Sequence, residues 1–203
     1  SVRQNSRQLH ITKLPAWIVA RISYVAPRGH TDEPGAVQRL LNPRRINSIK
    51  QFTLAGGDYP GAIVLNWTSR DTDFDLTDTS VEFAIYDDLA QIIDGQHRVA
   101  GISAAIDENP ELGSLELPIA LYSRLTTREC ADIFISINTE QKQVPKSLVY
   151  DLYGEASDKT ADQAAVRSRD IAVAFNDQED SPYFENIKFP GSPLRKGGIA
   201  LST

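Results

Sequence analysis

The residues best suited to chemistry lie in one short turn, Asp94 to Arg98, between an apolar strand and an apolar helix. Gly95 lets the backbone bend sharply and lets a ligand approach closely. The first turn of the following helix presents N–H groups beside His97 and Arg98. Amide hydrogens, the positive end of a helix dipole and a guanidinium group together suit an anion, above all phosphate. An ordinary strand-to-helix turn with polar surface residues explains the same pattern equally well.

Other kinds of site have weaker support. The three histidines are far apart, and the single cysteine, Cys130, excludes an intrachain disulfide and a Cys-rich zinc site. The common glycine-rich phosphate loops are absent. The acidic stretch 71–82 imitates the spacing of a calcium-binding loop, but Leu76 stands where glycine is required, so a hairpin loop is the favoured interpretation. Cys130 lies on the apolar stripe of a predicted helix and is expected to be a core residue.

The sequence Asp-Gly-Gln-His-Arg at 94–98 resembles the motif of the DGQHR-domain proteins, a family that includes the DndB-like proteins of DNA phosphorothioation. This family belongs to the wider ParB/sulfiredoxin-like superfamily. Residues 134–148 resemble the second characteristic block of the family, and residues 35–39 form a weaker third match. The resemblance covers roughly residues 35–155 and implies a ParB/sulfiredoxin-like α/β fold.

By this resemblance the turn would bind a nucleoside triphosphate, ATP or CTP, together with Mg²⁺. Gly95 and Gln96 would offer backbone N–H groups, while His97 and Arg98 would bind phosphate oxygens. Asp94 would brace the turn or hold a metal-bound water, so Asp94, His97 and Arg98 are the candidate catalytic residues. The further ligand-facing candidates are Gln38 and Arg39 near the N-terminus, and Asn138, Gln141 and Lys142 in the second block.

Alternatives remain for these roles. Asn138, Gln141 and Lys142 fall near a helix end, where capping and solvated polar side chains are the ordinary explanation. In sulfiredoxin a cysteine performs the chemistry inside the turn, and Gln96 replaces it here, which disfavours repair of cysteine sulfinate. No cluster of protein side chains is expected to hold a metal ion.

The elements that must position the turn follow from apolar periodicity and capping signals. Asn42 and Pro43 indicate a helix start, and Thr126 with Glu129 form a capping box for a second helix. Strands are expected at residues 17–25, 62–67, 81–86 and 117–122, with a further apolar strand that ends at Ile92 and Ile93. Helices are expected at 43–55, 96–106, 126–138, 147–153 and 158–175. The pattern predicts a small mixed sheet with flanking helices.

The helix after Pro43 would show Arg44, Arg45 and Lys50 on its outer side. These side chains could contact a DNA backbone, although a solvated helix face is the interpretation that we favour. A net charge of −6 excludes a uniformly basic surface, but it permits a local basic track.

The length of 203 residues suits one domain with appendages. We expect a flexible arm at 1–15, a DGQHR domain at 16–155 and a C-terminal helical extension at 156–203, within the same domain or incomplete. The absence of Met suggests that the sequence is incomplete. No apolar run is long enough for a membrane span and no signal segment is evident, so a cytoplasmic location is expected.

Three functions fit these observations. The first is a nucleotide-responsive DNA-binding regulator of a DNA-modification or phage-defence system, with slow hydrolysis of the nucleotide as one variant. The second is a DNA nuclease or nickase that uses the same cleft. The third is a non-catalytic module that binds other proteins of such a system, and the sequence leaves a homo-oligomer open in each case.

Overall fold

The computed structural model describes residues 1–5, 7–26, 41–71, 74–77, 80–139, 148–149, 152, 163–189 and 198–201. The chain forms two compact units, Ser1–Gln141 and Lys142–Thr203. The boundary expected between residues 155 and 156 lies outside the described residues.

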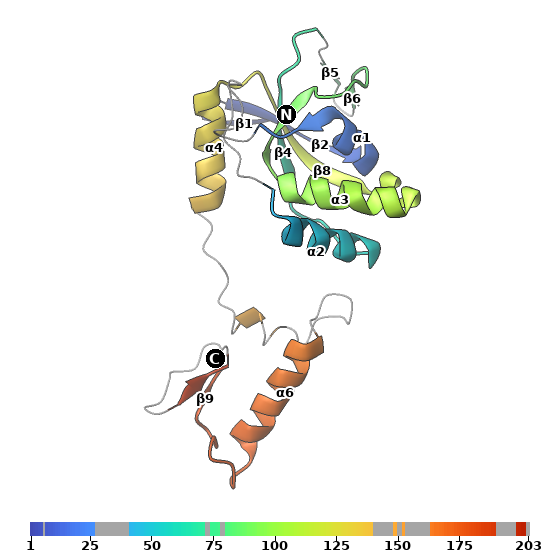
Figure 1. The fold of residues 1–203 in the computed structure, drawn as a ribbon. Coiled ribbons are helices and arrows are strands. Elements are labelled where there is room, and N and C mark those ends of the chain that lie inside the picture. The colour runs from blue at the N-terminus through green and yellow to red at the C-terminus, as the bar shows by residue number, and fades with distance from the viewer. Residues whose placement is uncertain are drawn as a thin grey trace. The chain divides into compact units, whose positions relative to one another are not determined.

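A six-stranded mixed sheet organises the first unit, with the order β1-β2-β8-β4-β7-β3 (Figure 1). The strand β4 is parallel to β8, and β3 is parallel to β7, whereas the other neighbours are antiparallel. The strands are β1 Val2–Gln4, β2 Arg7–Pro15, β3 Ser23–Tyr24, β4 Ile63–Trp67, β7 Ala90–Asp94 and β8 Glu116–Ser123. The expected mixed α/β core is therefore confirmed.

Helices cover both faces of this sheet. The helices α1 (Ala16–Ile22) and α3 (Gln96–Glu108) pack on one face, α2 (Pro43–Leu54) packs on the outside of α3, and α4 (Thr127–Thr139) covers the other face (Figure 1). A short 3-10 helix, Pro110–Ser114, follows α3. Successive side chains of β4 point to opposite faces of the sheet, so the strand contributes to the apolar core on each face. Leu65 joins the cluster under α1 and α3, and Val64 packs against the cluster under α4.

The expectation of a flexible arm at residues 1–15 is wrong. Residues 7–15 form β2, which pairs with β8 inside the sheet, and residues 2–4 add β1 as an edge strand. Leu9 is buried on the α4 side and Leu14 on the α1/α3 side. With one buried leucine on each face and mostly polar residues between them apart from the exposed Ile11, the strand has no apolar run that sequence analysis could recognise.

The strand expected at residues 17–25 is also wrong in most of its length. Ala16, Val19 and Ile22 are buried at intervals of three residues, and they form the inner face of α1. Only Ser23 and Tyr24 are extended. The β-branched composition of this segment favoured a strand, but the segment forms a helix because one side of that helix buries its apolar residues in the core.

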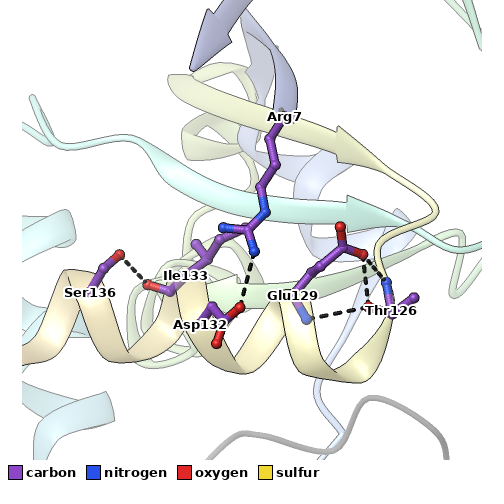
Figure 2. A network of polar contacts seen from close by, with 6 residues as sticks. All are labelled: Arg7, Thr126, Glu129, Asp132, Ile133 and Ser136. Carbon is purple, nitrogen blue, oxygen red and sulfur yellow. Dashed lines mark hydrogen bonds and ion pairs between the residues drawn. The ribbon is translucent and has the colours of Figure 1, made fainter. Parts of the chain in front are cut away.

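Two predicted helix starts are confirmed by their hydrogen bonds. The Asn42 side chain accepts from the N–H groups of Arg44 and Arg45, with Pro43 in the first turn of α2. The Thr126 hydroxyl accepts from the Glu129 N–H, and the Glu129 carboxylate accepts from the Thr126 N–H and hydroxyl (Figure 2).

A hairpin is present here, but β5 (Asp75–Leu76), which lies inside the stretch expected to be the loop, pairs with β6 (Val81–Glu82) in antiparallel fashion, while β4 pairs with β7 and β8. The strand expected at 81–86 is therefore shorter than predicted, since only its first two residues pair. Within the described part of the chain, no group of three or more His, Cys, Asp or Glu residues could hold a metal ion.

The second unit contains α6 (Gln163–Asp177) and a parallel pair of short strands, β9 (Ile187–Lys188) and β10 (Ile199–Ala200). The Asn176 side chain accepts from the Ile187 N–H at 3.1 Å and joins α6 to β9. Of the helix expected at 147–153, only residues 148, 149 and 152 are described. No helix among the described residues combines the length and the hydropathy that crossing a membrane requires.

Candidate functional site

The turn at the centre of the candidate site joins the end of β7 to the start of α3. Gly95 lies between them with φ of 101°, in the left-handed region where a side chain is disfavoured. A Cβ at this position would also lie 3.2 Å from Arg98 Nη2 and from an Ile63 side-chain carbon. The backbone conformation therefore favours glycine here, and the close approach of Arg98 and Ile63 adds to this preference.

Arg98 holds this turn to the segment before β4. Its guanidinium donates to the carbonyl oxygens of Gly61 at 2.5 Å and Ala62 at 2.9 Å, and to Asp94 Oδ2 at 3.0 Å. The Arg98 side chain is only 24% exposed. Asp94 thus braces the turn through Arg98, and a bound phosphate would have to share the Arg98 donors with these protein acceptors.

His97 contacts a different element. Its Nε2 accepts from the Asn42 N–H at 3.0 Å, and this bond joins the first turn of α3 to the start of α2. Burial, followed by the positive charge of Arg45, lowers the pKa of His97 from 6.5, so the imidazole is neutral at pH 7. Among the described residues, His97 and Arg98 thus bond to different segments, the start of α2 and the residues before β4. That both side chains bind phosphate oxygens stays a prediction.

The two helices α2 and α3 run parallel, with their N-termini at the same end. The Asn42–His97 bond joins their starts, Ile49 contacts Gly101 midway, and Lys50 pairs with Glu108 at 2.7 Å near the C-terminus of α3. The positive ends of both helix dipoles consequently face one side of the unit. This arrangement could attract an anion more strongly than the single helix considered from the sequence.

Arg44 and Arg45 add two exposed cations at this end. Within the described part of the chain, neither guanidinium takes part in an ion pair. At the start of α3, Val99 is the first residue whose N–H donates within the helix, to Gly95 O at 2.9 Å. Gly95 carries no side chain, and no side-chain hydrogen bond caps the start of α3 at this residue.

The other sequence candidates lie away from this cluster or outside the described residues. Lys50 is 26% exposed and its charge is offset by Glu108, which makes it a poorer DNA contact than Arg44 or Arg45. Asn138 Nδ2 donates to the carbonyl of Phe134, one turn earlier in its own helix, at 2.8 Å. A ligand-facing role for Asn138 stays a prediction. The remaining candidates, Gln38, Arg39, Gln141 and Lys142, lie outside the described residues.

Cys130 is fully buried, as predicted, and is not a reactive thiol. Burial and the charge of Glu129 raise its pKa to about 11. The buried Asn66 amide lies beside the Cys130 sulfur, and it also donates to Leu125 O and accepts from Leu125 N–H at 3.3 and 2.9 Å. This pair of bonds fixes the loop that leads from β8 into α4.

A cavity of about 230 Å³ between the β1–β2 hairpin, the sheet and α4 escaped the sequence analysis. Arg7 lines it and also pairs with Asp132 on α4 at 3.1 Å. These two residues are separated by 125 positions, and Arg7 stood in the segment that was expected to be an arm. No local pattern in the sequence could have joined them.

Comparison with protein families now adds to this geometry. The family model DndB, described as DNA-sulfur modification-associated, matches residues 1–176. This chain belongs to the DndB family. No curated protein gives a significant sequence match to it.

The DndB-family chain also resembles a solved structure, the C-terminally truncated chromosome-partitioning protein ParB from Caulobacter crescentus complexed with CTP-γ-S. The two superpose with a TM-score of 0.50 at 16% identity, over 81% of this chain and 79% of that chain. At this identity the likeness concerns the fold, and it confirms the expected ParB-like core.

The His97–Asn42 bond predicts a pH dependence of stability in this DndB-family chain. The pKa of His97 is lower in the folded state than the ordinary value of 6.5, so the folded state binds fewer protons. Its stabilisation is complete above pH 6.5 and is lost as the pH falls through the lowered pKa, because a protonated Nε2 cannot accept from Asn42. We expect a loss of about 1 kcal/mol in the free energy of unfolding.

Urea unfolding at several values of pH from 7.5 down to about 5 measures this effect. His97→Ala should flatten part of the profile. His10→Asn measures the separate contribution of His10, whose pKa is also lowered by burial, so that the flattening caused by His97→Ala can be told apart from it. A profile unchanged by His97→Ala would contradict the role given to the Asn42 bond.

Proposed function

We propose that this DndB-family chain is a nucleotide-responsive, DNA-binding regulatory component of a DNA-modification system. In this proposal the phosphates of the nucleotide bind at the paired N-termini of α2 and α3. The observation that carries it is the parallel packing of these helices, joined at their starts by the Asn42–His97 hydrogen bond.

The charges at this end of the unit support phosphate binding. The N-terminal ends of two helix dipoles and the exposed guanidinium groups of Arg44 and Arg45 act on the same region. Arg98 keeps the turn in shape through its bonds to Asp94 and to the carbonyls of Gly61 and Ala62. In this arrangement Arg98 positions the turn, and the backbone and the α2 arginines meet the phosphates.

The comparisons support the same class of ligand. The ParB protein of similar fold was crystallised with CTP-γ-S, and the DndB family is associated with DNA-sulfur modification. The ligand proposed here is ATP or CTP with Mg²⁺, an ion that proteins often hold mainly through phosphate and water. Slow hydrolysis would need a positioned water, for which the Asp94 carboxylate at the turn is the candidate orienting group.

DNA binding is assigned to the same basic end. With a net charge of −6, attraction of a DNA backbone depends on local cations, and Arg44 and Arg45 are exposed together on α2. A nucleotide bound beside them would change how much of their charge DNA can use, which gives the nucleotide a regulatory effect. No described cluster of acidic residues favours the nickase alternative.

Thermal unfolding with Mg²⁺ and either CTP, ATP or inorganic tripolyphosphate tests the phosphate site. A ligand at one hundred times its Kd should add about 2.7 kcal/mol to the free energy of unfolding. The double variant Arg44→Ser/Arg45→Ser should lose most of this gain, whereas Arg21→Ser, at another exposed arginine, should keep it. The absence of stabilisation by every ligand would refute the proposal.

The same variants test the DNA contact. Fluorescence anisotropy with a labelled duplex at several salt concentrations gives the number of phosphates neutralised. The Arg44/Arg45 variant should lower the magnitude of the slope of log K against log salt by about 2. An unchanged slope would place the DNA contact elsewhere.

A further inference from the structure

The cavity between the β1–β2 hairpin and α4 lies on the face of the sheet opposite to α3. Its floor is apolar and is made by Val64 of β4, Ala120 of β8 and Ile133 of α4. Its polar wall contains Arg7, Tyr122 and Ser136. A volume of about 230 Å³ is smaller than the usual pocket for a drug-sized molecule and suits one planar ring system between apolar surfaces.

The charges around Arg7 discriminate between ligands. Arg7 Nη2 pairs with Asp132 at 3.1 Å, and Figure 2 shows the arginine reaching from its strand to this helix. Glu129, the next carboxylate along α4, is occupied by the capping box. Two carboxylates near one guanidinium disfavour a phosphate in this cavity, while a neutral ring with hydrogen-bond acceptors carries no such penalty.

We propose that this cavity binds a nucleobase that presents two neighbouring acceptors to the Arg7 guanidinium. Guanine offers O6 and N7, and cytosine offers O2 and N3, whereas adenine places a donor beside each acceptor on the corresponding edges. The planar fork of arginine matches such a pair of acceptors, and the apolar floor contacts the ring face. Guanine and cytosine are therefore preferred over adenine.

The position of the cavity connects it with the proposed phosphate site. Val64, in its floor, is the register partner of Asp94, the residue that begins the turn into α3. A base in the cavity thus lies beside the strand end at which the turn starts. The inference deepens the proposed function and rests on it for the identity of the ligand as a nucleotide.

Tyr122 supplies a second polar group with a defined protonation state. It is 8% exposed, and burial raises the pKa of its hydroxyl, so the phenol stays protonated and can donate. The Ser136 hydroxyl donates to the carbonyl of Ile133 at 2.9 Å and keeps lone pairs for a donor on the ligand (Figure 2). The polar wall therefore contains both donors and an acceptor, as the edge of a base requires.

Methyl-labelled isoleucine NMR of the whole chain tests this inference with nucleosides, which lack phosphate. Guanosine or cytidine should shift the Ile133 signal, with adenosine at least about tenfold weaker in apparent affinity. Arg7→Lys should remove this preference because a lysine keeps the charge without the fork. Ser136→Trp should fill the cavity and abolish the shifts, and Lys13→Gln, at an exposed ion pair on the same strand, is the control that should leave them intact.

Any other result would contradict either the base site in the cavity or the phosphate site at the starts of α2 and α3. If no nucleoside shifts Ile133, or if adenosine binds as well as guanosine and cytidine, the base site is refuted, even where tripolyphosphate still stabilises the protein. Shifts that persist in Ser136→Trp would also refute it, by placing the nucleoside elsewhere. If nucleosides bind as expected while tripolyphosphate has no effect, the cavity stands and the phosphate site fails.

Discussion

Replacement of Arg98 with alanine is expected to lower the free energy of unfolding by about 3 kcal/mol. The variant loses a partly buried ion pair with Asp94 and the hydrogen bonds to the carbonyls of Gly61 and Ala62. It also leaves the Asp94 carboxylate, which is 31% exposed, without its partner. Each lost kcal/mol should lower the Tm by about 2–4 °C in a chain of this size.

Arg21→Ala is the matched control for this variant. Arg21 forms an ion pair with Asp87 at 2.9 Å, but both side chains are more than half exposed. Such a surface pair contributes at most about 1 kcal/mol. Equal losses in urea unfolding for Arg98→Ala and Arg21→Ala would show that Arg98 does not hold the turn.

The second large effect is expected at Gly101, in the middle of α3. A Cβ here would lie 2.5 and 2.6 Å from side-chain carbons of Ile49 and 3.0 Å from the carbonyl oxygen of Ile46. Alanine normally stabilises a helix relative to glycine by about 1 kcal/mol. In Gly101→Ala the steric conflict with α2 should outweigh this gain and destabilise the protein by about 2 kcal/mol.

Ala104→Gly serves as the control, because it tests helix propensity at a partly exposed position of the same helix. It should cost about 1 kcal/mol through propensity alone. Because α2 and α3 must separate to accept Gly101→Ala, this variant should also weaken stabilisation by tripolyphosphate. If Gly101→Ala proved more stable than the natural chain, the close packing of α2 on α3 would be disproved.

Local signals in the sequence predicted those helices whose first residues form capping hydrogen bonds with close neighbours in the chain. Asn42–Pro43 and the Thr126–Glu129 capping box mark helix starts through bonds within four residues, and both bonds form as expected. The run at 62–67 and the one before Asp94 are apolar on both faces, which suits the buried strands β4 and β7. The predictions for residues 7–15 and 17–25 were wrong because the burial of these segments depends on packing against β8 and α3, which are distant in the sequence.

The local geometry of the turn at 94–98 was predicted from the sequence, but most of the hydrogen bonds that hold it were not. The motif at 94–98 correctly indicated a glycine turn into a helix, since Gly95 has the expected left-handed conformation. Apart from Asp94 within the motif, the partners of Arg98 and His97 are Gly61, Ala62 and Asn42, which are 36 to 55 positions away. Such pairings depend on how β4 and α2 pack, and no spacing within the motif encodes them.

The side-chain amide of Asn66 donates to the carbonyl oxygen of Leu125 and accepts from its N–H, just before α4 begins. Together with the capping box and the Arg7–Asp132 pair, it concentrates the polar anchors of this helix in its first half, as far as the described residues show. The N-terminal end of α4 is therefore the end that these hydrogen bonds hold in place, and a tilt of the helix would pivot there. A ligand that contacts α4 near Asn138, at the end far from these bonds, would tilt the helix most easily. Such a tilt would widen or narrow the cavity between α4 and the sheet.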